Sequence, residues 1–537
     1  MKTHFKIGWS LTTLLLVASC INESVDNLQT NQSEENSAEL YALFSIGLPT
    51  INSRGVDGYE DTDEDTRKNE YAIDNAYIYY FQLSSNVASS TTPENGATFV
   101  TSQKLDLANW TEDHENTDLT GRKSLIVKLP FTPYQGDKYY ALLVLNQNNT
   151  FSIPKDKTTF DKWNESSKNF IEATGKINNM KYTSNGTEYF TMMNAPRYKN
   201  LKTVILEELD LSKLSTSLNN DSDPAATFYV QRGVAKVKIG ASKDKDLSSI
   251  EVLNSKAKIK ISNWALNLTN TISFPVQNIK GLDNYWKKEH FTSKTLTNFG
   301  YHLWWGIDPN YYGTESNSFG FNTISEVNNG INDIEYCLEN TMNYDQMKKN
   351  QITQVVFKCS YLLDGQNSNS FVVYDPTGLA FDISKYIKEN PTSTVDDQTS
   401  NKISHNLYKI NDLIQDKHIA TVVSDLKAVD GNSLVSYYPD GTTYYVAYIR
   451  HFNDEEAGLG GQEIKPVSYT EEHLGRYGIL RNNVYMVNVR SVKGFGLPTI
   501  PVPSNDIVDA VEEEKYLMFV DVNILAWAHR SYDYDLQ

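Results

Sequence analysis

Residues 75–81 read NAYIYYF, and similar runs follow at 125–129 (LIVKL) and 139–145 (YYALLVL). Each run is short, rich in β-branched and aromatic residues, and bounded by Gly, Asn, Asp or Pro, as strands are. Helical patterns are few, and we expect short helices only at 161–174 and 381–389. The sequence therefore predicts an all-β fold of β-sandwich domains with few short helices.

The length of 537 residues indicates more than one domain, since a domain typically takes roughly 100–200 residues. The polar segment LNNDSDPAA at 218–226 interrupts the strand pattern, and FYVQRGVAKVKI resumes it from Phe228. We therefore predict an N-terminal sandwich over residues 55–225 and a C-terminal sandwich over residues 226–505.

The composition suits an extracellular β protein, with 34 Tyr, 21 Phe and 8 Trp in the chain. A formal net charge of −18 repels phosphate backbones and anionic lipid. Nucleic acid is therefore excluded as an expected partner, and so is peripheral binding to an anionic membrane surface.

The N-terminus, MKTHFKIGWSLTTLLLVASC, has a basic start, an apolar run at 7–17, and small residues leading into Cys20. It resembles a bacterial lipoprotein signal over residues 1–20, in which Cys20 is lipidated. The alternative is an ordinary secretory signal that ends beside a cysteine. No later stretch reaches the roughly 18 apolar residues of a transmembrane helix.

Cys337 and Cys359 both lie in strand-like runs. They could form a disulfide in an oxidising compartment, or remain two separately buried thiols. Two cysteines and scattered histidines do not make a zinc site, so we expect no metal and no cofactor.

Motifs of enzymes are weak in this chain. Asp61–Asp65 starts like a calcium loop but lacks the required Gly and Glu, and Gly458–Gly461 lacks the Lys of a phosphate loop. No nucleophile with an identifiable partner appears. The sequence therefore predicts a protein that is not an enzyme.

The two ends of the chain carry strands of matched pattern. ELYALFSIGLPT at 39–50 has one apolar face at period two, and an exposed loop with Arg54 follows it; LMFVDVNILAW at 517–527 has another such face. An arginine in an exposed loop is open to an arginine-specific protease. The first face comprises Leu40, Ala42, Phe44, Ile46 and Leu48, and the last comprises Met518, Val520, Val522 and Ile524, followed by Trp527.

Several motifs together resemble the fimbrillins, the subunits of the type V pili of Bacteroidales, and most closely the minor-fimbria shaft subunit. They are the lipobox at Cys20, the Ser53–Gly55 junction, VQRGVAKV at 230–237, YYVAYIRHF at 444–452, GILRNNVY at 478–485 with GFG at 494–496, and the ending VDVNILAW at 520–527 with Tyr532–Leu536. The segment 497–515 before the last strand is shorter than the Pro-rich stretch of that family.

The resemblance implies two transthyretin-like, Greek-key sandwiches and a C-terminal donor-strand tail at 506–537. It implies a propeptide at 21–54, which contains the first strand and is cut between Arg54 and Gly55 by an arginine-specific protease. The donor strand of an identical subunit then fills the vacated groove, head to tail. It further implies tip and anchor subunits as partners, a lipidated outer-membrane precursor, and roles in adhesion and biofilm formation. No receptor is indicated.

Two alternatives stay open at this point. Both end strands could pair with neighbours inside one sandwich in the ordinary way. The chain could also be a glycan-binding lipoprotein of a polysaccharide-uptake system, with Trp286, Trp304 and Trp305 as stacking platforms, although packing in a core or at an edge suits these residues better.

Overall fold

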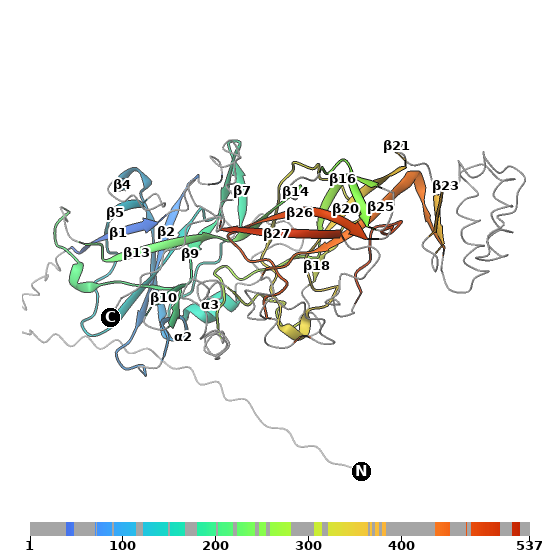
Figure 1. Cartoon of the computed structure of the whole chain (residues 1–537). Helices are drawn as coiled ribbons and strands as arrows, with labels where there is room; N and C mark the ends of the chain where they lie inside the picture. Colours follow the sequence, from blue (N-terminus) through green and yellow to red (C-terminus); the bar gives the residue numbers. More distant parts are fainter. Residues whose placement is uncertain are drawn as a thin grey trace, which may run out of the picture. The chain divides into compact units, whose positions relative to one another are not determined.

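The structure is a computed structural model, and its strands confirm the all-β prediction (Figure 1). The residues that it describes are 39–47, 70, 72–88, 91–113, 122–148, 151–166, 180–199, 202–218, 223–241, 246–253, 258–280, 305–313, 320–363, 366–367, 371–374, 379–382, 435–451, 469, 474–493, 495–504 and 518–526.

The N-terminal sandwich is a nine-stranded arrangement of order β3-β2-β6-β9-β13-β1-β5-β4, with β12 beside β6. The strand β13 belongs to both of its sheets, because its first half pairs with β1 and its second half pairs with β9. The predicted strands at 75–81, 125–129 and 139–145 lie in β2, β5 and β6. The bounds are β1 (Tyr41–Gly47), β2 (Ala76–Leu83), β3 (Thr98–Leu105), β4 (Thr111–Asp113), β5 (Arg122–Lys128), β6 (Lys138–Leu145), β9 (Met192–Asn194), β12 (Glu207–Glu208) and β13 (Ala226–Arg232).

Two apolar cores bury both faces of the sheet that contains β2 and β6. Alternate residues of β2, such as Ile78 and Tyr80, pack toward β1, β5 and β13, whereas Tyr79 and Phe81 pack toward Phe160 and Trp163. Double-sided burial explains why β6 reads as an almost continuous apolar run, YYALLVL, instead of alternating.

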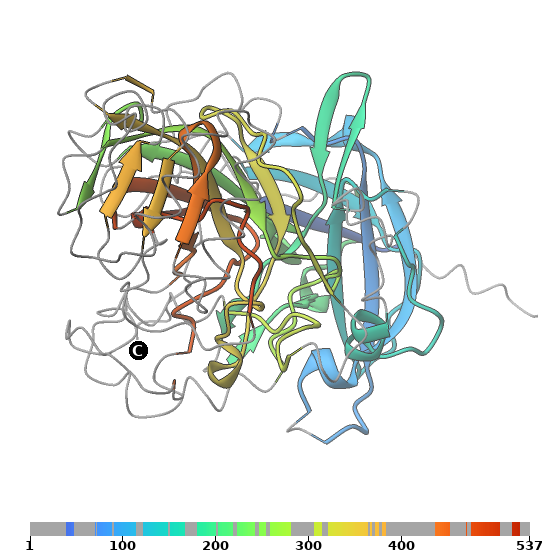
Figure 2. The same ribbon diagram turned by 90° about the vertical axis from the view of Figure 1, so that its right-hand side faces the viewer.

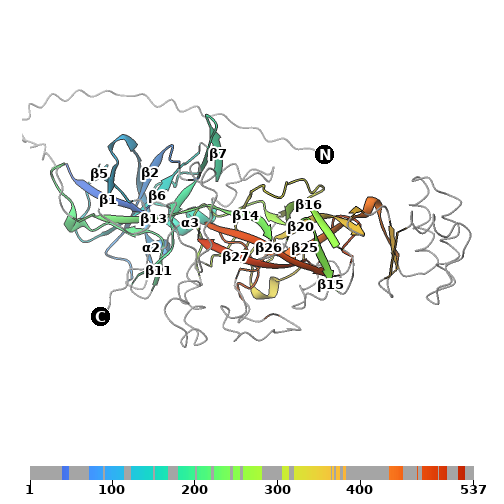
Figure 3. The same ribbon diagram turned by 45° about the horizontal axis from the view of Figure 1, so that its top comes forward.

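The C-terminal sandwich has the strand order β19-β14-β26-β15-β16-β20-β21, with β25 beside β20 and β27 beside β26 (Figures 1 and 3). The neighbouring strands β14 and β26 are parallel. The bounds are β14 (Val234–Ala241), β15 (Ile250–Leu253), β16 (Lys258–Asn267), β19 (Glu335–Leu338), β20 (Gln354–Leu363), β21 (Gln366–Asn367), β25 (Thr442–Tyr448), β26 (Asn483–Lys493) and β27 (Met518–Ala526).

Short elements complete the described part of the chain, which Figure 2 shows from a second side. They are α2 (Pro93–Gly96), α3 (Phe160–Ser166), β7 (Lys181–Ser184), β8 (Thr187–Phe190), β10 (Arg197–Lys199), β11 (Lys202–Val204), β17 (Thr269–Asn270), β18 (Phe321–Asn322), β22 (Phe371–Tyr374), β23 (Leu379–Asp382), β24 (Val435–Tyr438), and the 3-10 turns η1 (Leu107–Asn109), η2 (Leu211–Lys213), η5 (Tyr344–Gln346) and η6 (Pro439–Gly441).

Of the two predicted helices, the structure contains one in part. Helix α3 covers the start of 161–174, and 167–174 lies outside the described residues. The prediction at 381–389 is wrong at its start, because Phe381 and Asp382 belong to β23, which pairs with β22. Pairing with a neighbouring strand outweighs a weak helical period here.

The change from one sandwich to the other occurs at Gly233, between β13 and β14. The predicted boundary after residue 225 falls before β13, whose partners β9 and β1 lie in the N-terminal sandwich. A Cβ atom at Gly233 would lie 2.5 Å from the sulfur of Met180, so the chain passes very close to the N-terminal core here.

Candidate functional site

The first strand, β1, fills a slot between two strands that run in opposite directions (Figures 1 and 3). It pairs antiparallel with β5 over seven residues, from Tyr41 opposite Lys128 to Gly47 opposite Arg122. It pairs parallel with β13 over four residues, from Phe44 beside Ala226 to Gly47 beside Tyr229. The strand is therefore hydrogen-bonded on both edges.

The inner face of β1 is part of the sandwich core. Ala42, Phe44 and Ile46 are all 0% exposed, and Leu40 packs against the same cluster. The ring of Phe44 meets that of Phe228 edge to face, with centroids 5.5 Å apart. Burial of Phe44 and Ile46 contributes roughly 1.5–3 kcal/mol each. Leu48, the last member of the predicted face, lies outside the described residues.

The slot is lined by apolar residues of both sheets. Leu125 and Val127 come from β5, and Ile78 and Tyr80 come from β2. Burial raises the pKa of Tyr80 far above its ordinary value, so its hydroxyl stays neutral. Loss of β1 would expose this lining and leave two strand edges unpaired, an arrangement that has to be covered again.

On the outer face of β1, the last position, Gly47, has little room for a side chain. A Cβ atom on Gly47 would meet ring carbons of Tyr229 at 3.0 and 3.3 Å. Arg197 lies over the same ring, with its Cζ 5.0 Å from the centroid, and forms an ion pair with Glu207 at 2.6 Å. This close approach was not predicted from the sequence, since a glycine in a strand indicates proximity without naming the neighbour.

The last strand, β27, pairs antiparallel with β26 of its own C-terminal sandwich over nine residues, from Asn483 opposite Ala526 to Val492 opposite Met518. This is the ordinary pairing that the sequence left open as an alternative. The predicted donor residues Met518, Val520, Val522 and Ile524 lie in β27, and Trp527 lies outside the described residues. Cys20, Arg54 and Gly55 lie outside them as well.

Cys337 and Cys359 are free thiols, so the predicted option of a disulfide is wrong in this structure and the option of two buried thiols holds. They lie on β19 and β20, which are not neighbours in the sheet. Burial raises the pKa of both thiols, which keeps them protonated and unreactive.

A buried charge cluster at the start of β14 was missed by the sequence reading. The Lys236 ammonium lies 2.7 Å from Glu70 Oε1, and the two side chains are 0% and 3% exposed. The Tyr336 hydroxyl donates to the same oxygen, and Arg232 donates to the Glu70 carbonyl. The signal was Lys236 itself, a charge inside the apolar strand VAKVKI that requires a buried partner.

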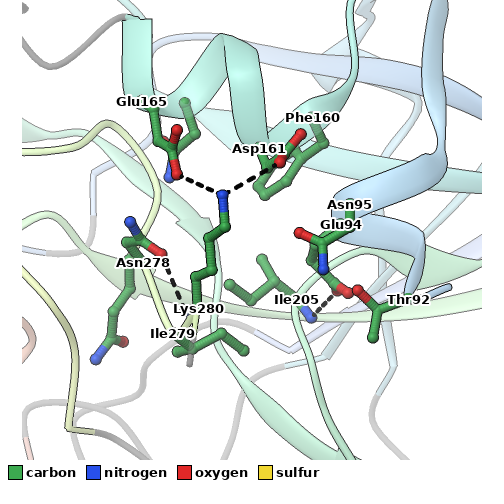
Figure 4. Close-up of a pocket in the computed structure, with 12 residues that line it drawn as sticks. Thr92, Glu94, Asn95, Phe160, Asp161, Glu165, Ile205, Asn278, Ile279 and Lys280 are labelled. Carbon is green, nitrogen blue, oxygen red and sulfur yellow. Dashed lines mark hydrogen bonds and ion pairs between the residues drawn. The ribbon is translucent and has the colours of Figure 1, made fainter. Parts of the chain in front are cut away.

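A small pocket of about 80 Å³ lies beside α2 and α3 (Figure 4). The Lys280 ammonium enters it and lies 3.0 Å from Glu165 and 3.6 Å from Asp161. The hydrogen bond to Glu165 raises the pKa of Lys280. The charges are paired with one another and the volume suits a few water molecules, so this pocket does not define a site for a larger ligand.

Within the described residues, no group of three His, Cys, Asp or Glu side chains is placed to hold a metal ion. No described helix is long and apolar enough to cross a membrane. The feature that stands out is therefore the slot around β1.

Comparison with known proteins gives one informative match. Residues 436–533 match the family described as major fimbrial subunit protein type IV, fimbrillin, C-terminal. These residues include β25, β26 and β27, so the resemblance to fimbrillins seen in the sequence is confirmed over this region. No curated protein matches the chain.

Two solved structures from Parabacteroides distasonis ATCC 8503 are distantly similar. A candidate cell adhesion protein is 11% identical over 91% of this chain and 99% of that one, with a TM-score of 0.34. A fimbrial assembly protein is 11% identical over 60% of this chain and 81% of that one, with a TM-score of 0.30. At these TM-scores neither likeness supports a conclusion about this chain.

Proposed function

We propose that this chain is the repeating structural subunit of a cell-surface fimbria, and that it polymerises by donor-strand exchange after proteolysis. The family match at 436–533 supports a fimbrial subunit. The observation that carries the mechanism is β1, a strand near the N-terminus that fills a two-sided slot and precedes Arg54 in the sequence.

The proposed trigger is a cut between Arg54 and Gly55 by an arginine-specific protease. While the chain is intact, β1 is tethered to its slot at an effective concentration in roughly the millimolar range, so an external strand loses the competition. The cut removes that advantage, and residues 21–54 leave with β1. The slot is then open to the C-terminal strand of another subunit, which adds by β-augmentation.

The donor strand must leave β26 of its own subunit to do so. Among the described residues β27 pairs along one edge, with β26, over nine residues. In the slot, β1 pairs with seven residues of β5 and four of β13 and also places its apolar face in a core. A strand in the slot gains about 0.5–1.5 kcal/mol per ladder hydrogen bond on two edges, in addition to apolar burial. Because the slot offers hydrogen bonds on two edges and an apolar core, we expect the exchange to be favourable.

The proposed pathway begins with a precursor that is lipidated at Cys20 and carried to the outer membrane. The assembled fimbria joins identical subunits to tip and anchor subunits and supports adhesion and biofilm formation. This role requires no cofactor, metal or enzymatic activity. The glycan-binding alternative loses one of its platforms, because Trp305 is 0% exposed, and Trp286 and Trp304 lie outside the described residues.

The mature N-terminus tests the proposal directly. Fimbriae sheared from the cell surface should yield subunits that begin at Gly55, measured by N-terminal sequencing and intact mass. An Arg67→Ala variant is the control, because Arg67 is the next arginine in the sequence and its loss should leave the mature mass otherwise unchanged. Assembled subunits that still begin at a lipidated Cys20 would sink the proposal.

A further inference from the structure

We infer that the last strand enters the neighbour's slot in the direction opposite to that of β1, with Ala526 in the place of Ala42 and Ile524 in the place of Phe44. This inference rests on the proposed function and adds the direction and register of the incoming strand, which together decide which side chains the slot selects.

The backbone of the slot does not fix a direction. Strand β13 runs parallel to β1 and β5 runs antiparallel to it, so the two flanking strands run in opposite directions. A guest strand of either polarity therefore makes one parallel and one antiparallel ladder. Parallel and antiparallel ladders differ only slightly in stability per residue. The fit of the side chains therefore decides the direction of the incoming strand.

The last strand read backwards matches β1 residue by residue. β1 reads YALFSIG from 41 to 47, and the tail read backwards from 527 to 521 gives WALINVD. Two positions are identical: Ala42 with Ala526, and Leu43 with Leu525. Four others keep their character: Tyr41 with Trp527, Phe44 with Ile524, Ser45 with Asn523, and Ile46 with Val522. The exception is Gly47, whose place Asp521 takes.

The forward alignment fits the slot less well. With Ile524 in the place of Ile46, it puts Val520 where Ala42 is fully buried and Leu525 where Gly47 touches the Tyr229 ring. Both changes add bulk to closely packed positions, which is destabilising. The reversed alignment keeps alanine at the first position and puts the shorter Asp521 at the second.

Shifting the strand by two residues keeps the apolar face inward but worsens the fit in either direction. A reversed shift puts Ile524 at the Ala42 position and Phe519 against Tyr229, or else puts Ala526 at the Phe44 position and leaves a void beside Phe228. A forward shift puts either Met518 at the Ala42 position or Trp527 against Tyr229.

Cysteine pairs can distinguish the two directions. Ser45 lies opposite Ser124 of β5, and both directions in their best register put Asn523 at the Ser45 position. Leu43 lies opposite Ile126, where the reversed strand puts Leu525 and the forward strand puts Asp521. Residues opposite each other on neighbouring strands are close enough for a disulfide. The native Cys337 and Cys359 are buried and do not compete.

The experiment compares fimbriae polymerised from three double variants, which are oxidised, boiled in SDS to separate non-covalent contacts, and run on non-reducing gels. Ser124→Cys with Asn523→Cys should give a covalent ladder in either direction. Ile126→Cys with Leu525→Cys should give an equal ladder, and Ile126→Cys with Asp521→Cys should remain monomeric. Tyr134→Cys, at a position 69% exposed, combined with Asn523→Cys is the control and should not form a ladder.

The outcomes separate the two proposals. A ladder with Asp521→Cys in place of Leu525→Cys overturns the reversed direction and leaves donor-strand exchange intact. A ladder only with Ser124→Cys and Asn523→Cys overturns the register at the Leu43 position. Fibres with no ladder from any of the three pairs overturn the register inferred here, because β27 shifted by two residues would give the same result. Donor-strand exchange fails as well if the subunits of those fibres still begin at Cys20.

Discussion

Phe44 is the residue of β1 with the largest buried side chain, and its ring is held against Phe228. In an uncut precursor, made with Arg54→Ala, Phe44→Ala should lower the free energy of unfolding by about 3–5 kcal/mol, because it leaves a cavity in the core. Leu43→Ala, on the partly exposed outer face, is the control and should cost about 1 kcal/mol. Denaturant titration measures both.

Neither substitution should change the stability of cleaved and assembled subunits, because the proposed cut removes β1, including residue 44, with the propeptide. Fibres from Phe44→Ala and from the unchanged chain should therefore unfold at the same denaturant concentration. A difference that persists in the fibres would mean that β1 stays in place.

A substitution at Val522 tests whether β27 is the donor strand. Val522→Asp should abolish long fibres, because an unpaired carboxylate in an apolar core costs several kcal/mol. Val522 also lies opposite the buried Val487 of β26, so thermal unfolding of the uncut protein must show that the variant still folds. Asn523→Asp changes the opposite face of the strand and should leave assembly intact. Electron microscopy of the cut proteins scores fibre length, and SDS-resistant ladders from Val522→Asp would show that this strand is not the donor.

Among the elements, strands with one buried face were the most predictable. Period-two alternation identified β1 and β27, and crowded β-branched and aromatic residues identified β2 and β6. The partner of a strand was less predictable, because alternation shows which face is buried and not which edge is covered. Thus the pairing of β27 with β26, and the place of β13 in the N-terminal sandwich, required the structure. Residues 381–382 joined a hairpin for the same reason.

The C-terminal strand as an element gives a further prediction. Deletion of residues 516–537 should give a chain that can be cut and can receive a donor strand but cannot supply one. Added at a low ratio to intact subunits, it should shorten fibres by capping them, as measured by electron microscopy. The same deletion combined with Arg54→Ala is the control: its slot stays filled by β1, so it should have no effect on length.

At the scale of the whole molecule, one chain carries a slot in its N-terminal sandwich and, towards its C-terminus, the strand that we propose as the donor. A head-to-tail contact of this kind need not close, and it generates an open filament. The family match covers only the C-terminal part of this pair. The slot itself became visible through the pairing of β1 with both β5 and β13.

Competition between the two end strands also leads to a prediction of when the molecule polymerises. The Arg54→Ala precursor should elute as a monomer in size-exclusion chromatography, and the unchanged chain should polymerise once an arginine-specific protease is added, with no nucleotide or metal. The reason is that β1 and the donor strand compete for one slot, and only the cut ends the covalent advantage of β1. Arg67→Ala should behave like the unchanged chain. Equal polymerisation of the Arg54→Ala protein, still uncut by mass, would mean that β1 does not block the slot.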